Sequence, residues 1–154
     1  MPETLLLCAD GRVITDEWIA LDDEAPLSQG KLLVGLARWQ AESEAIAAAA
    51  EAIGVRIPNT ADVEALTDTR RWSLIALEFP KFTDGRAYSQ ARLLRERLGF
   101  GGELRATGEV LRDQLFYMRR CGFDRFEIAP RYQAAQLAAA FDDFSTAYQP
   151  TGAA

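Results

Sequence analysis

Histidine is absent from the 154-residue sequence, and this absence excludes several classes of function. Ser-His-Asp and Cys-His catalytic units need a histidine base. Zinc and non-haem iron sites that depend on imidazole ligands are excluded for the same reason. The two cysteines, Cys8 and Cys121, are too few for a four-cysteine zinc or iron–sulfur site. We therefore expect no metal site in this chain.

Long hydrophobic runs are also absent. No stretch of 18 apolar residues occurs, so we expect no transmembrane helix and no membrane association. The N-terminus carries Glu3 and Asp10 without a basic segment, which is not the pattern of a secretory signal. These observations predict a soluble, cytoplasmic protein. In a reducing compartment Cys8 and Cys121 are expected to be free, structural thiols.

Lysine is scarce, since 15 of the 17 basic residues are arginine, and the charge is unevenly distributed. The net charge is −6, and residues 1–30 alone hold seven acids and one base. Residues 80–131 hold eleven bases and seven acids. This excess indicates either solvated helix faces with ordinary ion pairs or a surface for an anion or an acidic partner. The acidic total and the lack of a basic stripe with stacking aromatics argue against nucleic acid.

Alternating strand and helix patterns predict the α/β class. Periodicity and turn residues indicate five strands and five helices. The strands are expected at 32–36, 55–58, 73–79, 103–107 and 125–129, and the helices at 39–53, from Thr60, 84–98, 109–121 and 131–148. Such alternation favours a five-stranded parallel sheet covered by helices, either doubly wound or curved like half of an eight-stranded α/β barrel.

The expected organisation is one domain with two flanking segments. Residues 1–30 are predicted to be an acidic N-terminal extension that packs on the body, with a β-hairpin turn at Asp10-Gly11. Residues 31–148 are predicted to form the single α/β domain, and residues 149–154 a frayed tail. Nothing in the sequence fixes the oligomeric state, and a homo-oligomer is compatible with it.

Ligands of parallel α/β sheets favour the carboxyl ends of the strands, and the loop from Phe79 to Arg86 is the most informative there. Lys81 and Arg86 flank the start of a helix, whose free N–H groups also favour an anion. Asp84 fits a helix N-cap better than a general base. The complete candidate anion- or partner-binding set is Lys81, Asp84, Arg86, Ser89, Arg105 and Thr107. For Arg105, pairing with Glu103 or Glu109 on the surface is the alternative to lining this pocket.

Cofactor motifs are missing as well. Gly99-Phe100-Gly101-Gly102 follows a predicted helix rather than a strand, so it is a turn and not a dinucleotide fingerprint. No phosphate-binding loop of the P-loop type occurs, and no flavin, nicotinamide, haem or cluster site is visible. Cys121 lies at the predicted end of a helix, where the helix dipole disfavours a thiolate despite the neighbouring Arg119 and Arg120. We expect no bound cofactor.

The run from Phe79 to Asp124 closely resembles the bacterial family of the domain of unknown function nine-three-four. Three segments carry the resemblance, which extends over the whole domain and is weaker before Lys31. They are Phe79 to Arg86, Gly102 to Ala106, and Asp113 to Phe123. Genes of that family are typically found beside assimilatory sulfite reductase and the sulfonucleotide reductase. Its members are often labelled probable oxidoreductases involved in sulfite reduction, although no catalytic residues are established for the family.

The family label of probable oxidoreductase implies redox chemistry, but the sequence offers no site for a redox cofactor. Two hypotheses follow. The first is an accessory protein that acts with sulfite reductase through an Arg-rich surface or an oxyanion-binding loop for sulfite or sulfate. The second is a small enzyme of sulfur assimilation that uses Lys, Arg and Asp side chains at the carboxyl ends of the strands. A concave site that joins Lys81, Asp84, Arg86 and Arg105 favours the enzyme, and an exposed face of arginines favours the accessory protein.

Overall fold

The computed structural model describes residues 5–81 and 85–128. They form one eight-stranded sheet with the strand order β2-β1-β8-β7-β6-β5-β4-β3. The strands are β1 (Leu5–Cys8), β2 (Val13–Thr15), β3 (Ile19–Ala20), β4 (Lys31–Gly35), β5 (Ala52–Ile57), β6 (Leu74–Phe79), β7 (Glu103–Gly108) and β8 (Arg125–Glu127). The α-helices are α1 (Leu36–Ala49), α2 (Arg86–Glu96) and α3 (Leu115–Cys121).

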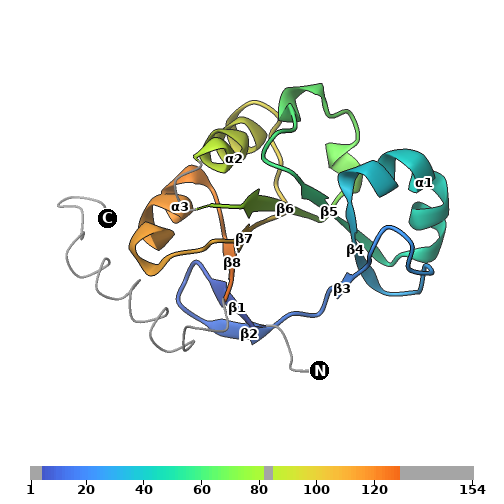
Figure 1. The fold of residues 1–154 in the computed structure, drawn as a ribbon, viewed down its shortest axis with the longest axis horizontal. Helices are drawn as coiled ribbons and strands as arrows, with labels where there is room; N and C mark the ends of the chain where they lie inside the picture. Colours follow the sequence, from blue (N-terminus) through green and yellow to red (C-terminus); the bar gives the residue numbers. More distant parts are fainter. Residues whose placement is uncertain (1–4, 82–84, 129–154) are drawn as a thin grey trace.

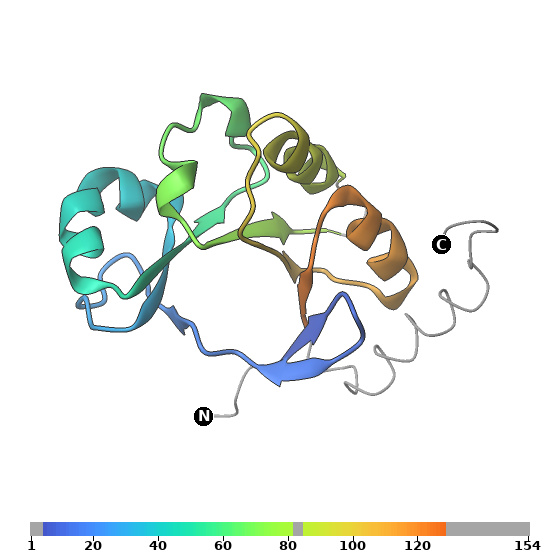
Figure 2. The same ribbon diagram turned by 180° about the vertical axis from the view of Figure 1, so that it is seen from behind.

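The sheet is curled, and the helices lie outside the curve. Figure 1 shows the strands around a central space, with α1, α2 and α3 at the periphery, and Figure 2 shows the same arrangement from behind. Strands β3 to β8 are parallel and adjacent in sequence order. Of the two arrangements compatible with the sequence, the structure therefore has the half-barrel, not the doubly wound sheet.

The predicted strand number was too low. All five predicted strands are present and parallel, but the N-terminal segment adds three more strands to the same sheet. β1 and β2 form the expected antiparallel hairpin, and β1 also pairs antiparallel with β8. β3 pairs parallel with β4. Two-residue β3 has no periodicity of its own, so its position depends on pairing with β4 and not on a local pattern.

The two faces of the sheet have different chemistry. Side chains on the convex face pack beneath the helices in the main core, for example Leu32 and Val34 on β4 and Ile75 and Leu77 on β6. Because side chains alternate along a strand, the intervening residues face the concave side. Leu33, Leu74 and Ala76 form a small apolar cluster there with Trp18. Charged side chains also lie on this side, among them Lys31, Glu103, Arg105 and Arg125.

The first predicted helix, 39–53, is displaced. α1 ends at Ala49, and Gly54, expected to cap it, lies inside β5. A Cβ at Gly54 would lie 3.0 Å from a Leu74 methyl and 3.1 Å from the Trp18 ring. The glycine is therefore required by close packing on the concave face.

Three other helix predictions differ from the structure. In place of the helix from Thr60 there are two short 3-10 turns, Val63–Ala65 and Thr69–Arg71, and Asp62 caps the first. The predicted 109–121 helix is a 3-10 turn, Arg112–Gln114, followed by α3. Its predicted end at Gly122 is confirmed, with φ +117°. The predicted helix at 84–98 is α2, which spans Arg86–Glu96. Its N-cap residue is Gly85, which makes no side-chain cap hydrogen bond. The predicted helix at 131–148 and the tail at 149–154 lie outside the described residues.

Among the described residues, no helix has the length and apolar character needed to cross a bilayer.

Candidate functional site

The loop that the sequence singled out joins β6 to α2. Lys81 follows β6, and Arg86 and Ser89 lie in the first turn of α2; all three side chains are exposed. Asp84 lies outside the described residues. The structure thus places Lys81, Arg86 and Ser89 near one helix start on the surface.

Arg105 and Thr107 lie elsewhere, on the concave face of β7. Arg105 is only 1% exposed. Its Nη1 and Nη2 donate to the two carboxylate oxygens of Asp16 at 3.0 and 3.2 Å, and its Nε donates to Glu103 Oε2 at 3.0 Å. The Thr107 hydroxyl donates to the Leu77 carbonyl at 3.3 Å. These hydrogen bonds of Arg105 and Thr107 therefore go to Asp16, Glu103 and Leu77, and none of them goes to Lys81 or Arg86. The pairing of Arg105 with Glu103 was one of the two alternatives from the sequence, but the pair is buried.

Asp16 makes this arrangement possible because it lies in the link between the two edge strands. Residues 16–18, the closing segment, connect β2 to β3 across the open side of the curled sheet (Figure 1). The Asp16 side chain is 12% exposed and also accepts the Trp18 amide at 3.0 Å. The bidentate pair with Arg105 ties this segment to β7 on the opposite side.

A cavity of about 400 Å³ lies beside these charged groups. Its lining combines acids, bases and apolar side chains: Leu6, Ile14, Thr15, Asp16, Glu17, Trp18, Lys31, Glu103, Arg105 and Arg125. We call this space the concave-face cavity. Lys31 and Glu17 form an exposed ion pair at 2.9 Å. The cavity therefore has a buried charged wall around Arg105 and an exposed ion pair.

Burial shifts the ionisation of two carboxyl groups here. Loss of hydration raises the pKa of Glu103, an effect that the charge of Arg105 partly opposes. Burial likewise raises the pKa of Glu127 on β8, again against the charge of Arg105. Both groups therefore hold a proton more tightly than an exposed glutamate does.

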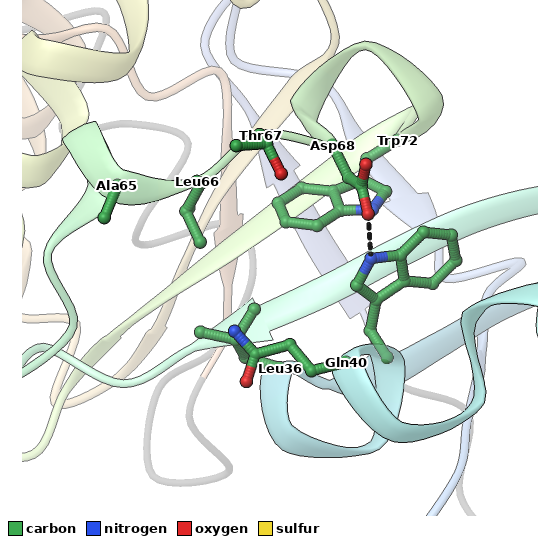
Figure 3. Close-up of a pocket in the computed structure, with 8 residues that line it drawn as sticks. Leu36, Gln40, Ala65, Leu66, Thr67, Asp68 and Trp72 are labelled. Atoms are coloured by element: carbon green, nitrogen blue, oxygen red, sulfur yellow. Dashed lines mark hydrogen bonds between the residues drawn. The ribbon is translucent and has the colours of Figure 1, made fainter.

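A second, smaller cavity of about 70 Å³ lies between α1 and the segment that connects β5 to β6 (Figure 3). Trp39 Nε1 donates to Asp68 Oδ2 at 3.1 Å, and the Trp39 and Trp72 rings meet edge to face, with centroids 5.9 Å apart. Both rings are at most 5% exposed. The volume suits about two water molecules. These contacts hold α1 against the segment that connects β5 to β6.

A group of arginines and aromatic rings lies on α2 and α3. Arg92, Tyr117 and Arg120 are exposed, and Phe116 and Arg119 are half-buried. Arg92 on α2 donates from Nη2 to the Tyr117 hydroxyl at 3.1 Å, with its guanidinium carbon 5.6 Å from the ring centre. Tyr117 is 45% exposed. The Arg119 and Arg120 guanidinium carbons lie 5.3 and 6.0 Å from the Phe116 ring centre. We call Arg92, Phe116, Tyr117, Arg119 and Arg120 the arginine–tyrosine face.

Both cysteines are buried free thiols. Burial is the main cause that raises the pKa of Cys8, which makes its nucleophilic thiolate less available. Within residues 5–81 and 85–128, no three His, Cys, Asp or Glu side chains gather in a way that could hold a metal ion.

A family model described as a bacterial protein of unknown function, DUF934, matches residues 54–154. The chain belongs to this family. The resemblance of Phe79 to Asp124 is thereby confirmed. No curated protein and no solved structure matches the chain.

The DUF934 match divides the concave-face cavity. It begins at Gly54 inside β5 and includes Glu103, Arg105 and Arg125. Asp16, Trp18 and Lys31 lie in the part of the chain before the match. The matched region therefore supplies part of the cavity lining, and residues before it supply the rest.

Sequence reasoning missed the functional groups that depend on distant contacts. Asp16 precedes Arg105 by 89 residues, so no local spacing connects them. Arg92 and Tyr117 meet only because α2 and α3 pack side by side. The excess of arginine in 80–131 was the available signal for the arginine–tyrosine face.

Proposed function

We propose that this protein is a cytoplasmic accessory protein of assimilatory sulfite reduction, and that it binds sulfite reductase through the arginine–tyrosine face. The pathway comes from the resemblance to the DUF934 family and the gene neighbourhood of that family. The observation that carries the binding mode is the exposed contact between Arg92 and Tyr117.

The composition of this face is that of a protein-binding hot spot. Tyrosine and arginine are enriched where alanine substitution costs the most binding energy. Tyr117 offers a large ring at low cost in side-chain entropy, and the hydrogen bond to its hydroxyl orients Arg92. Arginine side chains pair bidentately with carboxylates, which favours an acidic patch on the partner.

The enzyme hypothesis needs a concave site that joins Arg105 to the loop of Lys81 and Arg86. The placement of Arg105 does not support such a site. Its guanidinium N–H groups bond to Asp16 in the closing segment and to Glu103 on β7. Binding without catalysis by this chain is therefore the function that the geometry supports best.

Titration against purified sulfite reductase tests the proposal. Arg92→Ala and Tyr117→Ala are each expected to weaken binding ten-fold or more, because each removes a central contact. Arg97→Ala is the matched control. Arg97 is an exposed arginine just beyond α2 whose side chain is 71% exposed and pairs with Glu64. Wild-type affinity in all three variants, or no binding by the wild type at micromolar concentrations, would contradict the proposal.

The loop of Lys81 and Arg86 gives a separate route to the same role, through sulfite or sulfate. Calorimetric titration of wild type and Arg86→Ala with sulfite distinguishes it from the arginine–tyrosine face. If the loop holds the oxyanion, Arg86→Ala weakens sulfite binding ten-fold or more, since charge-assisted hydrogen bonds contribute about 1.5–3 kcal/mol each. If wild type and Arg86→Ala bind sulfite with equal affinity, the loop of Lys81 and Arg86 has no part in the proposed function. The arginine–tyrosine face would then be the remaining binding site.

A further inference from the structure

A third cavity lies at the amino ends of β6 and β7, between the 3-10 turn before β6 and the turn that joins α2 to β7. At about 410 Å³ it falls within the range of roughly 300–1,000 Å³ that is typical of small-molecule pockets. Its described lining residues are Thr69, Arg70, Trp72, Leu98, Gly99, Phe100, Gly101 and Gly102. None of them belongs to the arginine–tyrosine face. We call this space the glycine-loop cavity.

Arg70 gives this cavity an uncompensated positive charge. It is exposed, and it is the only charged side chain among the described lining residues. No ion pair or side-chain hydrogen bond joins Arg70 to another residue within 5–81 and 85–128. The neighbouring Arg71, in contrast, pairs with Glu44 at 3.5 Å and stacks over the Trp39 ring. An anion in the cavity would therefore meet an available guanidinium and no carboxylate of the described lining.

Arg95 holds the loop that forms the other side of the cavity. Its Nη1 donates to the carbonyls of Phe100 and Gly102 at 2.8 Å each, and its Nε donates to the Gly122 carbonyl at 3.0 Å. In a trans peptide the N–H points away from the C=O, so the N–H of Gly101 points away from Arg95. This N–H makes no hydrogen bond within the described part of the chain, and Gly101 is exposed. The loop is therefore fixed and presents an accessible donor.

The residue type at position 101 is not explained by the fold. Gly99 has a φ of +65°, and a Cβ at Gly102 would lie 2.6 Å from the Ser73 carbonyl oxygen. Gly101 has neither constraint, because its φ is not positive and an added Cβ would meet no atom within 4 Å. Glycine also serves where a ligand approaches the backbone closely. The open space at Gly101 gives a ligand that approach.

From these features we propose that the glycine-loop cavity binds a small-molecule phosphate ester. The phosphate group accepts from the Arg70 guanidinium and from the Gly101 N–H, which are the two kinds of donor that recognise phosphate in proteins. Its double negative charge is opposed by no acid of the described lining. The cavity is larger than a phosphate group needs, so the organic part of the ester lies in the remaining space, against Leu98.

Isothermal titration of the full chain tests the ligand class. The probes are glucose 6-phosphate and glycerol 3-phosphate, with glucose as the uncharged counterpart, gluconate as the carboxylate counterpart and inorganic phosphate as the bare anion. At least one ester is expected to bind ten-fold or more tightly than any of these three, and to raise the Tm as its concentration increases. Absence of ester binding at millimolar concentrations overturns the proposal, and so does gluconate or inorganic phosphate binding as tightly.

Two variants test the named contacts. Arg70→Ala removes the charged donor, and Gly101→Ala places a methyl group in the open space in front of the backbone N–H. Each is expected to weaken ester binding ten-fold or more. Arg71→Ala, in the same 3-10 turn but outside the cavity lining, is the matched control and should bind as the wild type does.

Far-UV circular dichroism and urea unfolding confirm that each variant is folded. Wild-type affinity in a folded Arg70→Ala or Gly101→Ala would overturn the assignment to this cavity, and so would an equal loss of affinity in Arg71→Ala. None of these outcomes bears on binding through the arginine–tyrosine face, so the two proposals fail independently.

Discussion

Arg105 is the residue on which the concave face depends. Removing one partner of a buried ion pair leaves the other charge without compensation, which costs about 3–5 kcal/mol. Arg105→Met leaves the carboxylates of both Asp16 and Glu103 without the guanidinium group that pairs with them. We expect this variant to lose about 3–5 kcal/mol of unfolding free energy in urea titrations.

Arg97→Met is the control for Arg105→Met. The pair of Arg97 with Glu64 is exposed, and exposed pairs contribute about 0–1 kcal/mol. Similar losses in the two variants would show that the pairs of Arg105 are no more important than a surface ion pair.

Glu127 gives stability a pH dependence that can be measured. Burial raises the pKa of Glu127 above its ordinary value of 4.5, so the folded state binds the proton more tightly than the unfolded state. Stability is therefore lost as the pH rises through the folded pKa, and the loss is absent below the unfolded pKa. Glu127→Gln should raise the Tm at neutral pH, and this advantage should shrink as the pH falls towards 4.5. An advantage of constant size over that range would contradict the assignment to this carboxyl.

At the scale of elements, β5 shows how closely the concave face is packed. Gly54→Ala places a methyl group 3.0 Å from a Leu74 side-chain atom and 3.2 Å from a Leu33 methyl. Overpacking of this kind costs about 1–3 kcal/mol, which urea unfolding would detect. Gly101→Ala is the matched control, because no atom lies within 4 Å of its added methyl and its φ is not positive. Equal stability of the two variants would mean that the neighbours of Gly54 move aside freely.

The elements that could be predicted from sequence are those with a pattern of their own. The apolar runs at Leu32–Leu36 and Ser73–Phe79 predicted β4 and β6, because a strand buried on both faces is nearly all apolar. The end of α1 could not be predicted. Gly54 has the typical residue type of a helix cap, but here the glycine is required by Trp18 and Leu74 from other elements.

The candidate site was less predictable than the fold. The excess of arginine in 80–131 indicated a binding surface, and Arg105 was recognised as a candidate for ion pairing. Its partner Asp16 belongs to a segment 89 residues earlier, so only the closure of the sheet brings the two together. The Arg92–Tyr117 contact likewise depends on the packing of α2 against α3.

For the whole molecule, the half-barrel needs the residues that precede the DUF934 match. A fragment of residues 54–154 leaves β5 without β4 and β8 without β1. It also removes Leu32, Val34 and Trp39 from the core. We expect this fragment to lack a cooperative unfolding transition, and addition of residues 1–53 as a separate chain to restore it. A cooperative transition in the fragment alone, followed by circular dichroism, would show that the matched region folds independently.

The pairing of β1 with β8 has a consequence for the newly made chain. Leu6 lies opposite Glu127 and Cys8 opposite Arg125. Strand β1 is synthesised well before β8, so this pairing cannot form until β8 has been made. Until then, β1 has only β2 as a partner, and the Leu-rich segment Leu5–Cys8 has an unpaired edge. Unpaired apolar edges promote aggregation, and long-range pairings form slowly. Completion of the sheet therefore follows the synthesis of β8, and the interval before it is the period in which the nascent chain most needs protection from its neighbours.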